Sequence, residues 1–167
     1  MPANTRLNIY KNQIKAHPEY MELKQLNILL ADDDIDDCIF FKKALTELPM
    51  PTQLTTVHDG EELMQMLINE TTQLPHVIFL DINMPRKNGF ECLADIKKND
   101  RLKDVPVIMF STSNSRDAMS TLFKTGADIY IRKPRNFEQL KELIHHALPM
   151  ATEKVFSDSQ LKYILNA

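Results

Sequence analysis

The chain has 167 residues, of which 43% are hydrophobic and 26% are charged, a size and composition that favour one packed domain with short appendages over two domains. Its formal net charge of −3 argues against a nucleic-acid surface, which needs clustered basic residues, so we expect protein partners. The first residues lack the apolar core of a signal peptide, and no later apolar run is long enough to cross a membrane. We therefore expect a soluble, cytoplasmic protein with no membrane partner.

Between Leu26 and Leu148, short apolar runs alternate with longer amphipathic runs, a pattern typical of repeated βα units around a parallel sheet. The predicted strands are Asn27–Ala31, Gln53–Val57, Val77–Leu80, Val105–Phe110 and Ile129–Ile131. The predicted helices are Ile35–Leu48, Glu61–Asn69, Phe90–Lys98, Arg116–Lys124 and Phe137–Leu148. Right-handed crossovers would place these helices on both faces of the sheet.

The first predicted helix carries apolar residues at three- and four-residue intervals, which predicts a stripe that faces the core. These residues are Ile35, Cys38, Ile39, Phe41, Leu45 and Leu48. The two cysteines, Cys38 and Cys92, have neither paired spacing nor neighbouring histidine clusters. We interpret both as small core residues rather than as a disulfide or a zinc site.

The two ends of the chain lie outside the repeated pattern. We treat residues 1–25 as an N-terminal extension, residues 26–148 as the domain and residues 149–167 as a C-terminal tail. Within the tail, Ser157–Ser159 could cap a final helical turn, and a loosely docked tail is an equal alternative. The tail is too short for a DNA-binding module, so we expect output through protein contacts.

Carboxylates follow two of the predicted strands. Asp32 and Asp33 follow the first strand, and Asp81 follows the third. The carboxyl ends of parallel strands meet at one edge of a sheet, where ligands bind in such folds. Converging carboxylates repel one another unless their pKa values rise or a cation neutralises them. Because all the ligand atoms would be oxygen, we expect Mg²⁺.

The acids near the first strand also allow other interpretations. Asp34, Asp36 and Asp37 are interpreted as cap and dipole partners of the first helix. An EF-hand loop starting at Asp32 fails, because Asp37 and Lys43 occupy the positions that need glycine and glutamate. A flavin or dinucleotide site fits poorly, since no glycine-rich loop follows the first strand.

Two more strand ends complete the candidate site with Ser111 and Lys133. Together with a metal, Lys133 would neutralise phosphoryl oxygens, Ser111 would donate a hydrogen bond, and Asp81 would attack phosphorus as a carboxylate nucleophile. Taken alone, Lys133 would more often be a solvated surface lysine. Suitable residue types at four strand ends together indicate a phosphoryl-transfer site.

These residues resemble the receiver domain of two-component response regulators. The resemblance runs from Leu26 to Leu148, and its motifs occur in the family's order, in Leu30–Asp34, Phe79–Gly89, Phe110–Thr112 and Lys133–Pro134. It implies a flavodoxin-like, doubly wound parallel sheet of five strands in the order 2-1-3-4-5, with helices on both faces. In that order the first and third helices cover opposite faces, which would keep the two cysteines apart.

The resemblance also implies roles for individual residues. Asp81 would accept a phosphoryl group from the phosphohistidine of a sensor histidine kinase or a phosphotransfer protein. Asp33, Asp81 and the backbone carbonyl of Asn83 would bind Mg²⁺ directly, and Asp32 would act through a bound water. Asn83 and Ser113 would influence the lifetime of the acyl phosphate, which a water molecule hydrolyses.

Tyr130 matches the switch aromatic of the family, which moves inward when the Ser111 hydroxyl turns toward the phosphoryl group. A half-buried tyrosine on an edge strand is an equally weighted alternative. The Lys133–Pro134 bond resembles one that is cis in the family and aims the lysine into the pocket. Arg135 stands where an aromatic residue often follows the proline, a change that would alter a surface near the site.

The segment 111–115 and the long connection before the fourth strand resemble the small single-domain regulators that accompany phytochrome-type kinases. We expect phosphorylation to change a surface formed by the fourth helix, the fifth strand and the fifth helix, for an unknown downstream protein or a second copy in a homodimer. Phe123, Ile129 and Phe137 are candidate contacts there, and core packing explains them equally well.

Two other functions compete with this one. A phosphohydrolase of the haloacid-dehalogenase type also uses a strand-end aspartate and Mg²⁺, but it needs a second aspartate where Asn83 stands. A pseudo-receiver that only binds partners would leave the acidic residues without a use. We expect no enzyme in the ordinary sense, because the chain would catalyse only its own phosphorylation and dephosphorylation.

Overall fold

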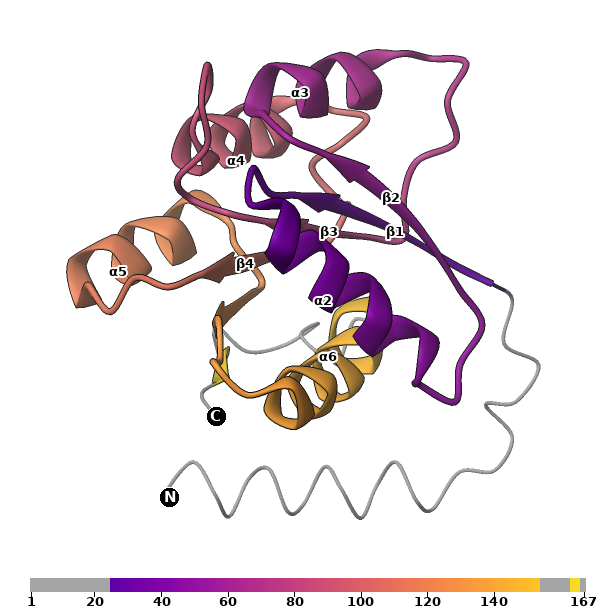
Figure 1. The fold of residues 1–167 in the computed structure, drawn as a ribbon. Coiled ribbons are helices and arrows are strands. Elements are labelled where there is room, and N and C mark those ends of the chain that lie inside the picture. The colour runs from indigo at the N-terminus through magenta and orange to yellow at the C-terminus, as the bar shows by residue number, and fades with distance from the viewer. Residues whose placement is uncertain (1–24, 154–162, 166–167) are drawn as a thin grey trace.

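The computed structural model describes residues 25–153 and 163–165, and it contains one parallel six-stranded sheet in the order β2-β1-β3-β4-β5-β6 (Figure 1). The strands are β1 (Leu26–Ala31), β2 (Thr52–Val57), β3 (Val77–Leu80), β4 (Val107–Ser111), β5 (Ile129–Arg132) and β6 (Tyr163–Leu165). The predicted order of the first five strands, 2-1-3-4-5, is confirmed.

Helices cover both faces of the sheet, as the flavodoxin-like fold requires (Figure 1). They are α2 (Ile35–Thr46), α3 (Gly60–Ile68), α4 (Gly89–Lys98), α5 (Arg116–Thr125) and α6 (Phe137–Thr152). Helices α2 and α6 pack on one face, and α3, α4 and α5 pack on the other. None of the helices in the described ranges is long and apolar enough to cross a membrane.

Each of the helices α2 to α6 begins at a polar side chain that accepts a hydrogen bond from at least one backbone N–H group of the first turn, which would otherwise lack a partner. These N-cap residues are Asp34, Asp59, Asn88, Ser115 and Asn136. Each one closes a short loop that leaves the carboxyl end of a strand. The caps therefore help to fix the loops in which the predicted site residues lie.

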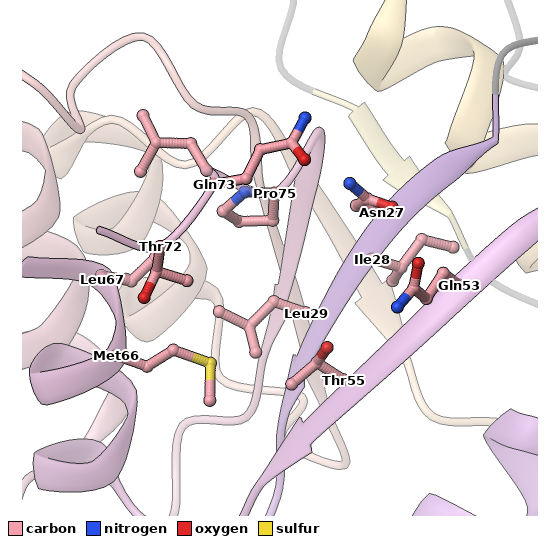
Figure 2. Close-up of a pocket in the computed structure, with 11 residues that line it drawn as sticks. Asn27, Ile28, Leu29, Gln53, Thr55, Met66, Leu67, Thr72, Gln73 and Pro75 are labelled. Atoms are coloured by element: carbon pink, nitrogen blue, oxygen red, sulfur yellow. The ribbon is translucent and has the colours of Figure 1, made fainter. Parts of the chain in front are cut away.

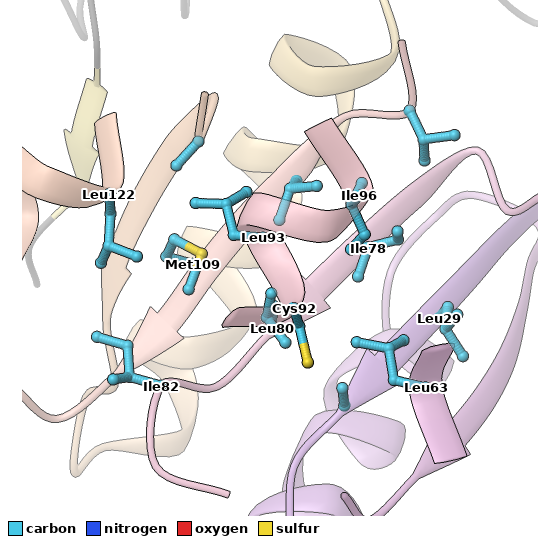
Figure 3. Close-up of a cluster of buried hydrophobic side chains, with 14 of the residues drawn as sticks. Leu29, Leu63, Ile78, Leu80, Ile82, Cys92, Leu93, Ile96, Met109 and Leu122 are labelled. Atoms are coloured by element: carbon cyan, nitrogen blue, oxygen red, sulfur yellow. The ribbon is translucent and has the colours of Figure 1, made fainter. Parts of the chain in front are cut away.

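The apolar side chains form two cores that are separated by the sheet. In the first core, the Phe41 ring of α2 meets the rings of Phe79 and Phe110 edge to face, with centroids 4.7 Å and 5.7 Å away. Figure 3 shows the second core, where Cys92 lies among leucine, isoleucine and methionine side chains. Cys38 belongs to the first core and Cys92 to the second, and both are buried free thiols, as predicted.

The predicted core stripe of the first helix is partly wrong. Ile35 is 61% exposed and Ile39 is 59% exposed. The neighbouring Phe40 is 52% exposed. The face that packs on the sheet carries Cys38, Phe41, Ala44 and Leu45, and this stripe leaves Ile35 and Ile39 to one side. By contrast, Phe123 and Ile129, which were considered as partner contacts, are core residues.

The C-terminal region also differs from the prediction. Helix α6 continues to Thr152 instead of ending at Leu148. Residues 163–165 form strand β6, which pairs in parallel with β5, so β5 is not an edge strand. The expected cap at Ser157–Ser159 lies outside the described residues, as does the N-terminal extension up to residue 24.

Candidate functional site

The structure brings together three of the predicted acids. Strands β1 and β3 are neighbours in register, with Ala31 beside Leu80, so the residues that follow them lie side by side. Asp32, Asp33 and Asp81 each place a carboxylate oxygen within 4.8 Å of the others. Asp32 and Asp81 are buried and Asp33 is exposed, so the cluster opens to solvent on one side.

Lys133 reaches this cluster from the end of β5. Its Nζ donates hydrogen bonds to Asp32 Oδ2 at 2.7 Å and to Asp37 Oδ2 at 2.8 Å, and it lies 3.4 Å from Asp81 Oδ2. The Lys133 side chain is only 8% exposed. The expected cis bond between Lys133 and Pro134 is wrong, since the peptide is trans. The lysine enters the pocket without it, held by a bond from its backbone N–H to the Ser111 carbonyl.

Asp37 is a site residue that sequence reasoning missed. It was interpreted as a partner of the helix dipole, but its carboxylate forms an ion pair with Lys133. The available signal was its place in the first turn of α2, directly after the acids that end β1. Asp34, in contrast, has the predicted capping role, because its Oδ1 accepts from the backbone N–H groups of Asp36 and Asp37.

Burial makes these carboxylates weaker acids than usual. Desolvation raises the pKa of Asp32 from 3.8 to about 6, against the opposing effect of its hydrogen bond from Lys133. The pKa of Asp81 is also raised by burial, and Lys133 again acts in the opposite direction. Burial alone would lower the pKa of Lys133, but its hydrogen bonds to Asp32 and Asp37 outweigh it and raise the pKa, so the ammonium stays charged.

The donor set fits a hard divalent cation. Lys133 forms ion pairs with Asp32, Asp37 and Asp81, and Asp33 adds one more carboxylate beside Asp32 and Asp81, so carboxylates outnumber the single ammonium group. Its ligand atoms are all oxygen, and one side is open to water. Mg²⁺ takes few carboxylate ligands and keeps several waters, which matches this arrangement.

The side chains of Ser111 and Tyr130 are both hydrogen-bonded to the backbone of Ser113, which lies two residues beyond the end of β4. The buried Ser111 hydroxyl accepts a hydrogen bond of 3.3 Å from the Ser113 backbone N–H. The Tyr130 hydroxyl donates to the Ser113 carbonyl at 2.9 Å. Tyr130 is 1% exposed and lies on an interior strand, so the half-buried edge-strand alternative does not describe it.

The backbone of the loop that follows Asp81 contacts Asp81. The Ile82 backbone N–H donates to Asp81 Oδ1 at 2.7 Å, and the Gly89 N–H donates to the Ile82 carbonyl at 2.8 Å. A Cβ atom at Gly89 would lie 2.2 Å from the Asp81 carbonyl oxygen, so only glycine fits there. The loop thus fixes one carboxylate oxygen of Asp81 through the backbone.

Cavities lie both beside this site and at a distance from it. One, of about 630 Å³, opens beside Lys133 and is lined by Asp37, Phe40 and Arg135, among others. The unusual Arg135 therefore lies on the surface next to the site, as expected. The other cavity, of about 210 Å³, lies between the amino-terminal halves of β1 and β2 and the end of α3, away from the acidic cluster (Figure 2). Its lining is neutral, so it offers no comparable chemistry.

The sequence and the fold resemble those of known signalling proteins. Residues 28–145 match the family described as the response regulator receiver domain. Response regulator Rcp1 of Synechocystis sp. is 31% identical over 121 residues, which cover 70% of this chain and 82% of Rcp1. A probable chemotaxis protein CheY of Rhizobium etli is 27% identical over 121 residues, covering 72% of this chain and 91% of that protein.

Solved structures show the same similarity. The phosphorylated cyanobacterial phytochrome response regulator RcpA superimposes with a TM-score of 0.72 and 30% identity, covering 79% of this chain and 97% of RcpA. The Mn²⁺-bound form of response regulator Rcp1 superimposes with a TM-score of 0.68 and 28% identity, covering 80% of this chain and 96% of Rcp1. One of these relatives is thus known in a phosphorylated form and the other with a divalent cation.

Proposed function

The chain belongs to the family of response regulator receiver domains, and from this premise we propose that it accepts a phosphoryl group on Asp81 from a sensor histidine kinase or a phosphotransfer protein. The observation that carries the proposal is the position of Asp81. Its buried carboxylate lies 3.4 Å from Lys133 and in one cluster with Asp32 and Asp33. The proposed nucleophile, the positive charge of Lys133 and the proposed oxygen-only metal site would therefore share one pocket.

Asp33, Asp81 and the backbone carbonyl of Asn83 would hold Mg²⁺, with Asp32 acting through a bound water. When bound, the ion would neutralise charge on the phosphoryl oxygens during transfer. The acidic cluster supports this proposal, because three carboxylate oxygens already lie within 4.8 Å of one another.

In the proposed transfer, a carboxylate oxygen of Asp81 forms a bond to phosphorus while the bond from phosphorus to the donor's histidine nitrogen breaks. The electron pair of the broken bond stays on the imidazole. Lys133 favours the ionised form of Asp81, which is the form that attacks, and then pairs with a phosphoryl oxygen. The Ser111 hydroxyl donates to another oxygen. Water later hydrolyses the acyl phosphate, and Asn83 and Ser113 influence the rate.

The contact of Ser111 and Tyr130 through Ser113 supports a switch. The Ser111 hydroxyl now accepts a hydrogen bond from the Ser113 backbone N–H. If the hydroxyl turns toward the phosphoryl group, this hydrogen bond is lost. The Ser113 carbonyl holds the Tyr130 hydroxyl, so movement of this segment would be passed to β5 and to the neighbouring surfaces of α5 and α6. A downstream protein or a second copy of the chain would recognise that surface.

We also propose the division into an extension (1–25), a receiver domain (26–148) and a tail (149–167). The family match over residues 28–145 supports the middle segment. The stand-alone form, similar to the regulators that accompany phytochrome-type kinases, is part of the same proposal. The 31% identity to Rcp1 and the superposition on RcpA support it.

The test is incubation with acetyl phosphate and Mg²⁺, followed by intact mass and a phosphate-affinity gel. The wild type should gain one phosphoryl group, and Asp81→Asn should gain none. Asp104→Asn is a matched control, since Asp104 is exposed and precedes β4 at the opposite end of the sheet. An unchanged wild-type mass would contradict the proposal, and multiple turnovers of a small phosphomonoester would favour the phosphohydrolase instead.

A further inference from the structure

The loop that joins β2 to α3 touches both of the loops that carry the acidic cluster. We call His58 and Asp59 of this loop, together with Gly60 at the start of α3, the brace. His58 Nδ1 lies 3.1 Å from the backbone carbonyl oxygen of Asp32. A carbonyl oxygen can only accept, so the ring donates from Nδ1. This bond ties the brace to the segment that ends β1.

Asp59 ties the brace to the loop that follows Asp81. The Asp59 side chain is 9% exposed, and its two oxygens have different partners. Oδ1 accepts from the Glu62 backbone N–H at 2.8 Å and so caps α3. Oδ2 lies 3.1 Å from Arg86 Nη1. Helix α3 and the loop after Asp81 are thereby joined through a single carboxylate.

Gly60 brings the two backbones into direct contact. A Cβ atom at this position would lie 2.0 Å from the Lys87 carbonyl oxygen and 2.7 Å from Cys92 Sγ. The Cys92 thiol donates to the Gly60 carbonyl at 3.6 Å. Only glycine permits this approach, so the start of α3 is fitted closely against the loop after Asp81.

Arg86 has a backbone conformation that needs such support. Its φ is 64°, and it is the one residue other than glycine with positive φ in the described parts of the chain. A long side chain in the left-handed region is disfavoured, and it persists where the surroundings hold it. Within positions 83–86, Met84 packs into the second core, whereas the side chains of Asn83, Pro85 and Arg86 are exposed, so core packing does not hold Arg86 itself.

We propose that Asp59 and Arg86 are a positioning pair, which holds the loop after Asp81 in the shape that the metal site needs. His58 holds the Asp32 segment in the same way. This inference rests on the proposed function, because it assigns residues that control the metal affinity of the same site. None of the brace residues is among the proposed metal or phosphoryl ligands, so their effect would pass through Asp32 and through the loop that contains Asn83.

The ion pair of Asp59 and Arg86 holds the loop after Asp81 in place but adds little to the free energy of unfolding. The Arg86 side chain is 62% exposed, and ion pairs with such exposed partners add little to folding. Its left-handed backbone opposes folding. Loss of the pair should therefore change loop dynamics and metal affinity while the melting temperature stays the same or rises.

Arg86→Gly separates these effects, because glycine adopts a φ of 64° without strain and lacks the guanidinium. In the metal-free variant, hydrogen exchange of the backbone amides at positions 83–87 should be faster than in the wild type. Calorimetric titration with Mg²⁺ should give a dissociation constant about three- to fivefold higher. Arg86→Lys should recover part of the affinity.

Two further variants complete the design. Asp59→Asn keeps a residue that caps helices well but removes the charge, so it should repeat the effects of Arg86→Gly without unfolding α3. Lys98→Ala, at an exposed position that ends α4, changes the net charge by the same amount as Arg86→Gly and should bind Mg²⁺ like the wild type.

Wild-type exchange rates and Mg²⁺ affinity in Arg86→Gly would overturn the inference. So would a lowered melting temperature with unchanged affinity, which would mark the pair as merely structural. If the wild type itself binds no Mg²⁺, the proposed function fails. The amide exchange of the metal-free proteins would then still decide whether Asp59 and Arg86 position the loop.

Discussion

The burial of Asp32 predicts an unusual dependence of stability on pH in the metal-free protein. Asp32 is fully buried, and desolvation raises its pKa from 3.8 to about 6. A rise of this size corresponds to about 3 kcal/mol. The folded state binds the proton more tightly than the unfolded state. The stabilisation from this group is therefore complete below about pH 4 and is lost as the pH rises through about 6.

Comparison with Asp32→Asn isolates this effect. Urea unfolding of both proteins would be measured with a chelator present, at pH 7.5 and at pH 5. Between these values the wild type should gain about 1 kcal/mol of unfolding free energy relative to the variant. Asp81 is present in both proteins, so to first order its titration cancels.

Parallel profiles for the wild type and Asp32→Asn would refute this reasoning, because they would mean that the buried carboxylate titrates alike in the folded and unfolded states. A wild type that loses stability on acidification relative to the variant would refute it more strongly. That result would show that the ion pair with Lys133 outweighs desolvation.

Three other predictions concern the cores and the loop after Asp81. Phe41→Ala should lower the unfolding free energy by about 3–5 kcal/mol, whereas Phe40→Ala, next to it but 52% exposed, should cost less than about 1 kcal/mol in the same urea titration. Gly89→Ala would place a Cβ atom 2.2 Å from the Asp81 carbonyl oxygen, so both the melting temperature and phosphorylation by acetyl phosphate should fall; wild-type values for both would contradict the close contact. Burial raises the pKa of Cys38 to about 12 and of Cys92 to about 11, so neither thiol should react with a thiol reagent at neutral pH until denaturant is added.

Features that depend on local pattern could be predicted from the sequence. The run Val77–Leu80 has no polar alternation, and it is a fully buried strand, because a parallel sheet with helices on both faces excludes water from both sides. Asp32 and Asp81 could be expected to meet, since parallel strands end at the same edge of the sheet. The strand order itself came only from the resemblance to receiver domains.

Features that depend on contacts between distant segments could not be predicted. Spacing alone suggested a stripe through Ile35 and Ile39, but the orientation of α2 on the sheet exposes both. The ion pair of Asp37 with Lys133 joins residues 96 positions apart, and the place of Asp37 in the first turn of α2 does not name that partner. Strand β6 is three residues long, too short for a recognisable alternation.

Borohydride trapping can show directly whether Asp81 itself carries the phosphoryl group. Borohydride reduces an aspartyl phosphate to homoserine, which peptide mass spectrometry can locate in the chain. After treatment with acetyl phosphate and Mg²⁺, homoserine should be found at position 81 and at no other aspartate. Unmodified Asp81, or homoserine at Asp32, Asp33 or Asp37 instead, would contradict it.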